Sequence, residues 1–157
     1  MAAIERKEPV PDEPGQTVSL EPEPEADQGL LADFITETRE HLEEVERNVL
    51  LLEQQPDDAA VLNEIFRSIH TIKGSSEYLG MERIAELSHK LESLLDLLRR
   101  GERSVDAGTV DLLMGCHDRI GTLVDELAEH QAEQSSVDYL IAELAKSLEP
   151  VEQPDEQ

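Results

Sequence analysis

Aromatic residues and cysteines are scarce in this sequence of 157 residues. It has two Phe, two Tyr and no Trp, so a folded core must be built mainly from aliphatic side chains. Its single cysteine, Cys116, leaves no partner for an internal disulfide, which favours a reducing compartment. No apolar run approaches the roughly 18 residues typical of a membrane span, and no apolar segment of a secretory signal follows Met1. We therefore expect a soluble cytoplasmic protein.

Positive charge is also scarce. The sequence has 13 Lys and Arg against 37 Asp and Glu, which gives a formal net charge of −24. Such a surface repels the phosphate backbone of nucleic acids and the headgroups of anionic lipids. The composition therefore predicts that neither nucleic acid nor a membrane is a partner.

Prolines are absent from most of the chain and concentrate near its two ends. They are Pro9, Pro11, Pro14, Pro22, Pro24, Pro56, Pro150 and Pro154. Residues 1–28 carry eight acidic side chains and few apolar ones, too few to offset the entropy lost on ordering. We predict a disordered acidic tail over 1–28, a folded domain over 29–149, and a tail or linker over 150–157.

Apolar residues recur at helical spacing in five segments of the central region. Spacings of three, four and seven place residues such as Phe34, Leu42 and Val49 on one helix face. Pro56 ends the first segment, Asp57 and Asp58 offer an N-cap for the second, and Gly80 is typical of its C-cap. Helices are expected at about 29–54, 58–79, 82–100, 106–130 and 137–148. Because the loops are short, the predicted fold is all-α: an antiparallel four-helix bundle with an additional C-terminal helix.

Two pairs of polar residues flank the apolar stripes of the second and third predicted helices. His70 and Lys73 are three residues apart and share a face, as do His89 and Glu92 on the next helix. Flanking positions on adjacent antiparallel helices can meet at the groove between them. There, Glu92 would hold the proton on one imidazole nitrogen and leave the other free to attack. Lys73 would supply an ammonium group for a phosphoryl oxygen.

Gly74 lies one turn after His70, inside a helix where glycine is about 1 kcal/mol less favourable than alanine. Its missing side chain would leave room for a partner to approach His70. Alternatively, it would allow two helices to pack closely. Lys73 also has an alternative interpretation, as a solvated residue paired with Glu77 four positions later.

The other three histidines have structural interpretations. His41 fits a solvated helix face, His117 borders an apolar stripe, and His130 lies at a helix end. His70, His89 and Glu92 together could bind a metal instead. Since the sequence has no H-E-x-x-H pattern, no Cys cluster and no obvious fourth ligand, we expect no metal and no other cofactor.

Two strings, "IFRSIHTIKGSS" and "AELSHKLESLLDLLR", resemble the histidine-containing phosphotransfer domains. They are most similar to the N-terminal phosphotransfer domain of the chemotaxis histidine kinase CheA. The resemblance covers about Leu31 to Leu127. It rests on an H-[ST]-x-K-G motif and on an H-x-x-E motif in the next predicted helix, and it implies a helical bundle.

The resemblance implies a role for each matching residue. His70 corresponds to the histidine that accepts and donates a phosphoryl group, with Lys73 beside it and Gly74 one turn on. His89 and Glu92 correspond to the residues that hydrogen-bond with the phosphorylated ring. The implied function is therefore a phosphotransfer module of a two-component or chemotaxis phosphorelay.

The resemblance also implies partners. These are a histidine kinase catalytic domain and the receiver domains of response regulators, whose aspartate takes the phosphoryl group. Gly74 is expected on the docking surface, with Glu77 at a position where family members often carry glycine. Glu77 therefore adds negative charge to that surface. The isolated domain is expected to be a monomer.

Autonomous kinase activity is not expected, because the sequence contains no glycine-rich phosphate loop and no room for a nucleotide-binding domain. The chain would receive phosphoryl groups from another chain, or be the acceptor domain of a longer CheA-type kinase. The alternative function is a catalytically inactive helical adaptor that only binds receiver or kinase domains. An altered acceptor histidine would favour that alternative, but His70 is intact.

Overall fold

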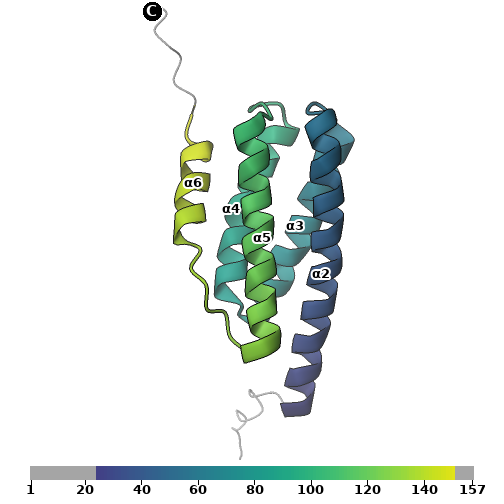
Figure 1. The fold of residues 1–157 in the computed structure, drawn as a ribbon, viewed down its shortest axis with the longest axis vertical. Coiled ribbons are helices and arrows are strands. Elements are labelled where there is room, and N and C mark those ends of the chain that lie inside the picture. The colour runs from purple at the N-terminus through teal and green to yellow at the C-terminus, as the bar shows by residue number, and fades with distance from the viewer. Residues whose placement is uncertain (1–23, 151–157) are drawn as a thin grey trace, which may run out of the picture. The chain divides into compact units, whose positions relative to one another are not determined.

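A computed structural model describes residues 24–150. Within this range the chain forms helices joined by short connections, and no strand occurs there (Figure 1). The helices are α2 (Pro24–Gln54), α3 (Ala59–Leu79), α4 (Glu82–Arg99), α5 (Ala107–His130) and α6 (Asp138–Leu148). The predicted all-α fold is confirmed. No helix of the described residues is both long and apolar enough to cross a membrane.

Helix α2 begins at Pro24, whereas the sequence predicts a start near residue 29. Residues 24–28 are therefore helical. Proline is tolerated in the first turn of a helix because its fixed φ suits the helix and its missing N–H would have no partner there. The rest of the expected tail, 1–23, and the segment 151–157 lie outside the described residues.

The chain divides into two compact units after Asp33, and the bundle belongs to the second unit. In that unit α3 and α4 pack against each other in antiparallel directions. Asn63, early in α3, accepts a hydrogen bond from Arg99 at the end of α4, at 3.2 Å. Lys73, later in α3, reaches Glu92, earlier in α4. The predicted antiparallel arrangement therefore places residues of the two motifs side by side.

Helices α2 and α5 are also antiparallel. Arg39 forms an ion pair with Asp125 at 2.8 Å, whereas the later residue Leu42 contacts the earlier residue His117. The Nε2 atom of His117 donates a hydrogen bond of 3.0 Å to the carbonyl oxygen of Leu42. His117 thus ties two helices together, in keeping with a structural role. Helix α6 lies beside α4 and α5 as the additional helix (Figure 1).

The core of the bundle is aliphatic, as the scarcity of aromatic residues predicts. Its largest fully buried side chains are Leu52, Ile65, Ile69, Ile72, Ile84, Leu87, Leu91, Leu94, Leu95, Leu113, Ile120 and Leu123. Burial of one such side chain contributes about 1.5–3 kcal/mol relative to leaving it exposed. Cys116 also lies in this core as a free, fully buried thiol. Burial raises the pKa of that thiol to about 12.

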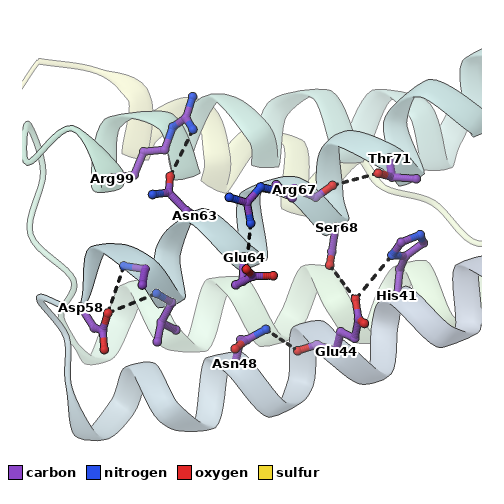
Figure 2. A network of polar contacts seen from close by, with 12 residues as sticks. His41, Glu44, Asn48, Asp58, Asn63, Glu64, Arg67, Ser68, Thr71 and Arg99 are labelled. Carbon is purple, nitrogen blue, oxygen red and sulfur yellow. Dashed lines mark hydrogen bonds and ion pairs between the residues drawn. The ribbon is translucent and has the colours of Figure 1, made fainter.

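The ends of α3 have the capping residues that the sequence indicates. The side chain of Asp58 accepts hydrogen bonds from the backbone amides of Ala60 at 3.0 Å and Val61 at 3.3 Å (Figure 2). Gly80 ends the helix with φ of 77°, a conformation that glycine adopts without strain. These caps fix both ends of the helix that carries His70.

The start of α4 is capped by a residue from a distant loop. Its N-cap, Met81, offers no side-chain hydrogen bond. Instead, the carboxylate of Glu133, between α5 and α6, accepts hydrogen bonds from the backbone amides of Arg83 at 2.9 Å and Ile84 at 2.7 Å. A carboxylate is favourable at this position because it satisfies free amides and faces the positive end of the helix dipole.

The carboxylate of Glu126 fixes the same loop, and we expect its contribution to depend on pH. Partial burial raises its pKa, but hydrogen bonds from the side chain and backbone of Ser135 and from the backbone of Gln134 outweigh this effect. The pKa is therefore below the usual 4.5. A group with a lowered pKa in the folded state stabilises the fold above its unfolded pKa. This stabilisation is lost as the pH falls through the folded pKa.

We therefore expect Glu126→Gln to lower the free energy of unfolding at pH 7, by less than about 1 kcal/mol because solvent screens the site. The difference from the wild type should shrink below pH 4.5, the usual value for the free group. Urea unfolding at several pH values measures it. Glu46→Gln, at an exposed carboxylate of α2, is the matched control. A difference that persisted unchanged well below that pH would contradict the expectation.

Candidate functional site

Helix α3 exposes the side chain of His70 but buries the apolar residues of the stripe next to it. The side chain of His70 is 60% exposed, whereas Ile69 and Ile72 are buried in the core. The apolar stripe therefore holds the helix against the bundle and leaves the imidazole on its outer edge. A large partner can reach this ring without unfolding any part of the domain.

The carboxylate of Glu92, on α4, contacts both His70 and Lys73. One of its oxygens is hydrogen-bonded to Nδ1 of His70, and the other accepts a hydrogen bond of 2.7 Å from Nζ of Lys73. The side chains of Glu92 and Lys73 are only 13% and 19% exposed. The structure thus brings together three of the four residues that the two sequence motifs place on facing helix edges.

Glu92 is ionised at neutral pH. Partial burial raises its pKa. The hydrogen bonds and charges of Lys73 and His70 lower it by more, so the pKa is below 4.5. An ionised carboxylate has no hydrogen to donate, so Nδ1 of His70 must carry the shared proton. In the neutral ring the lone pair of Nε2 is then free. This arrangement makes His70 suited to act as a nucleophile.

Lys73 pairs with Glu92 and not with Glu77. Among the described residues no ion pair joins Lys73 to Glu77, so the solvated i, i+4 pair is not formed. An ammonium group has three hydrogens. Lys73 can therefore keep its contact with Glu92 and still donate a hydrogen bond to an anionic group bound at His70.

His89 is not joined to this cluster. It is exposed, and its side chain makes no hydrogen bond or ion pair with any described residue. Its backbone carbonyl accepts a hydrogen bond from Ser93. His89 lies about one turn from Glu92 along α4. Its expected contact with a phosphorylated ring remains a prediction.

Gly74 lies on the open surface. A Cβ atom added there would meet no heavy atom within 4 Å, so close packing against another described helix does not require glycine. His70, Gly74, Glu77 and Tyr78 share one face of α3, because their spacings are four, seven and eight residues. Glu77 is exposed, and Tyr78 is 83% exposed. This face combines an exposed imidazole, a position without a side chain, a negative charge and an aromatic ring.

The structure also shows a contact that the sequence analysis missed. The ring of Phe66 is nearly parallel to that of His70, with 8° between the planes and 6.1 Å between the centroids. The guanidinium of Arg99 lies 3.7 Å from the centre of the Phe66 ring. The spacing of four residues between Phe66 and His70 could have indicated the first contact. Nothing in the sequence indicated the second, which joins two helices.

The turn before His70 is also anchored to its neighbours. Figure 2 shows Ser68 donating a hydrogen bond to the carboxylate of Glu44 on α2, at 3.3 Å. Arg67 forms an ion pair with Glu64 at 2.8 Å, and its carbonyl accepts a hydrogen bond from Thr71. The contact of Ser68 with Glu44 joins α3 to α2, whereas the other two lie within α3.

A metal centre is not assembled from these groups. Within residues 24–150 no set of three or more His, Cys, Asp or Glu side chains is placed to hold a metal ion.

Comparisons with known proteins show the family of this chain. The chain matches the Hpt domain family over residues 29–146. The chemotaxis protein CheA of Listeria monocytogenes is 33% identical over 122 residues, which cover 78% of this chain and 20% of that protein. The chain therefore spans about a fifth of the length of this curated relative.

Two solved structures share the fold. The CheA phosphotransferase domain from Thermotoga maritima is 35% identical, with a TM-score of 0.61 over 62% of this chain and 93% of that one. The phosphorylated P1 domain of CheA3 in complex with CheY6 from R. sphaeroides is 27% identical. Its TM-score is 0.70 over 78% of this chain and 96% of that one.

Proposed function

Because this chain belongs to the Hpt domain family, we propose that it is a phosphorelay module of the CheA type. His70 receives a phosphoryl group from a histidine kinase catalytic domain and passes it to the aspartate of a response-regulator receiver domain. The observation that carries this proposal is an exposed imidazole whose Nδ1 is held by an ionised carboxylate. Such a ring presents Nε2 to solvent as a nucleophile.

The chemistry of the two transfers follows from this arrangement. Nε2 of His70 attacks the γ-phosphorus of ATP held by the kinase domain, a nitrogen–phosphorus bond forms, and ADP leaves with the electrons of the broken phosphorus–oxygen bond. The proton on Nδ1 stays in place, and Glu92 stabilises the positive charge that the ring acquires. A carboxylate oxygen of the receiver then attacks the phosphorus, and the electron pair returns to Nε2. Lys73 donates to a phosphoryl oxygen during both steps.

The partners are proposed from the relatives and the surface. The complex of a CheA3 P1 domain with CheY6 supports docking of a receiver domain on the face that carries His70, Gly74 and Glu77. We place the protein in the cytoplasm, where kinases and receivers of this kind work and where a single free thiol such as Cys116 is stable.

A transfer assay tests the proposal. The protein is incubated with a CheA-type kinase catalytic domain and ATP labelled in the γ-phosphate. We expect a label that is lost in acid and survives base, as a phosphoramidate does. Addition of a receiver domain with Mg²⁺ should then remove the label from this chain. An acid-stable label, or a label that no receiver removes, would contradict the proposal, and receiver binding without any label would support the adaptor function.

Substitutions of Gly74 should separate stability from partner access. Gly74→Ala should raise the free energy of unfolding by about 1 kcal/mol, because alanine favours the helix and meets no neighbour. Gly74→Leu should keep the helical content but slow transfer to a receiver by about tenfold, the effect of losing about 1.4 kcal/mol of docking energy. Chemical denaturation, circular dichroism and the transfer assay measure these effects.

The matched control is Ala142→Leu, which adds similar bulk to an exposed position of α6. This variant should transfer at the rate of the wild type. Transfer by Gly74→Leu at the rate of the wild type would show that Gly74 has no part in docking.

A further inference from the structure

We propose that Phe66, supported by Arg99, is a positioning residue that fixes the plane of the His70 ring for phosphoryl transfer. The proposal rests on the function proposed for His70, and it concerns side chains that neither sequence motif predicted. Its basis is the stack of an imidazole, a phenyl ring and a guanidinium at the junction of α3 and α4.

The geometry of the first contact restrains the imidazole. Phe66 and His70 lie one turn apart on α3, and their rings are within 8° of parallel at 6.1 Å between centroids. This separation is in the range of about 4.5–7 Å found for interacting aromatic rings. The torsion that tilts a histidine ring is broad and roughly two-fold. A parallel neighbour therefore restricts a motion that the ring would otherwise have.

Glu92 alone does not provide the same restraint. Its hydrogen bond holds one edge of the ring at Nδ1, and the ring can still rock about the line of that bond. Phe66 acts on the plane of the ring rather than on its edge. The two contacts together fix both the tautomer and the direction in which Nε2 points.

Arg99 in turn restrains Phe66. Its guanidinium lies 3.7 Å from the centre of the phenyl ring, well within the distance of about 6 Å for a cation–π contact. The guanidinium is itself held, because Arg99 donates hydrogen bonds to Asp96 at 3.0 Å and to Asn63 at 3.2 Å. Figure 2 shows the contact with Asn63, which joins the end of α4 to the start of α3.

Phe66 is not simply a core residue. It is only partly buried, while Ile65 and Ile69 beside it on α3 fill the interior. The stack borders an open hollow of about 300 Å³ next to the nucleophile, lined by Phe66, Glu92, Ser93, Asp96 and Arg99. At this partly open site an aliphatic side chain would pack equally well. An aromatic ring is needed only if its plane orients the neighbouring imidazole.

The test compares variants that keep or remove the ring. Phe66→Leu keeps an apolar side chain but removes the parallel plane, and Phe66→Tyr restores the plane. We expect Phe66→Leu to lower the rate of His70 phosphorylation about two- to tenfold, because a freed ring spends less time with Nε2 in the direction of attack. We expect Phe66→Tyr to recover most of the rate. In the unphosphorylated protein, NMR relaxation of the His70 ring carbons should show greater ring motion only in Phe66→Leu.

Arg99 should act through Phe66. Arg99→Ala alone should lower the rate by a smaller factor, and Phe66→Leu with Arg99→Ala should be no slower than Phe66→Leu alone, since residues that act as a unit are not additive. Phe34→Leu is the matched control. It makes the same change at the other phenylalanine, in the core, and should reduce stability without changing the motion of the His70 ring.

Each outcome bears on one proposal. Ring motion and phosphorylation rate in Phe66→Leu equal to those of the wild type would overturn the positioning role, as would an additive effect of Arg99→Ala. A loss of rate in Phe66→Leu that Phe66→Tyr does not recover would also overturn it. If the wild type takes no label on His70, the phosphorelay function itself fails, whereas the NMR measurement still reports whether Phe66 orders the ring.

Discussion

Replacement of His70 by glutamine should abolish phosphorylation of the chain. Glutamine is polar, fits an exposed helix position and leaves the bundle intact, but its amide nitrogen has no lone pair available for attack on phosphorus. The imidazole is the group whose Nε2 is left free by the contact between Nδ1 and Glu92. We expect label from a kinase domain and ATP to fall to background.

The measurement includes a matched control. His130→Gln makes the same change at an exposed histidine at the end of α5 and should be labelled like the wild type. Circular dichroism should show the same helical content in all three proteins. Equal labelling of His70→Gln and the wild type would show that another residue accepts the phosphoryl group.

Replacement of Glu92 by alanine should slow phosphorylation about 10- to 100-fold without abolishing it, the size of effect seen when the partner behind a metal-ligating histidine is removed. The variant loses the acceptor that keeps the proton on Nδ1, so fewer molecules present a free Nε2. It also leaves the partly buried ammonium of Lys73 without its carboxylate. The nucleophile itself remains, which is why some activity should persist.

Further variants identify which property of Glu92 matters. Glu92→Gln retains an oxygen that can accept from Nδ1 but removes the charge, so its rate should fall between those of the wild type and Glu92→Ala. Glu64→Ala is the control and should phosphorylate normally, because among residues 24–150 this exposed carboxylate of α3 pairs only with Arg67. An unchanged rate in Glu92→Ala would remove this residue from the site.

The helices were predictable because their cause is local. Each has an aliphatic stripe with a period near 3.6 residues, and residues such as Asp58 and Gly80 mark ends that depend only on nearby backbone groups. The start of α2 at Pro24 was not predicted, since residues 24–28 carry no apolar stripe at helical spacing. The cap of α4 by Glu133 was also missed, because it joins residues far apart in the sequence.

The site was predictable only in part, for a related reason. Spacing within a helix shows that His70 and Lys73 share a face, and the same holds for His89 and Glu92. It does not show how far one helix is shifted along the other. The observed shift places Glu92 beside His70 and leaves His89 without a partner among the described side chains. The position of Arg99 over Phe66 depends on that same shift and on side-chain rotamers.

The buried thiol of Cys116 has a practical consequence for measuring these interactions. It is the sole cysteine of the chain, has no exposed surface and remains protonated at neutral pH because burial raises its pKa to about 12. Maleimide dyes react with accessible thiolates, so a cysteine introduced on the surface would be labelled selectively while the native one is kept. Fluorescence energy transfer from such a site to a labelled receiver would then follow docking on the His70 face in real time, in a protein whose core is unaltered.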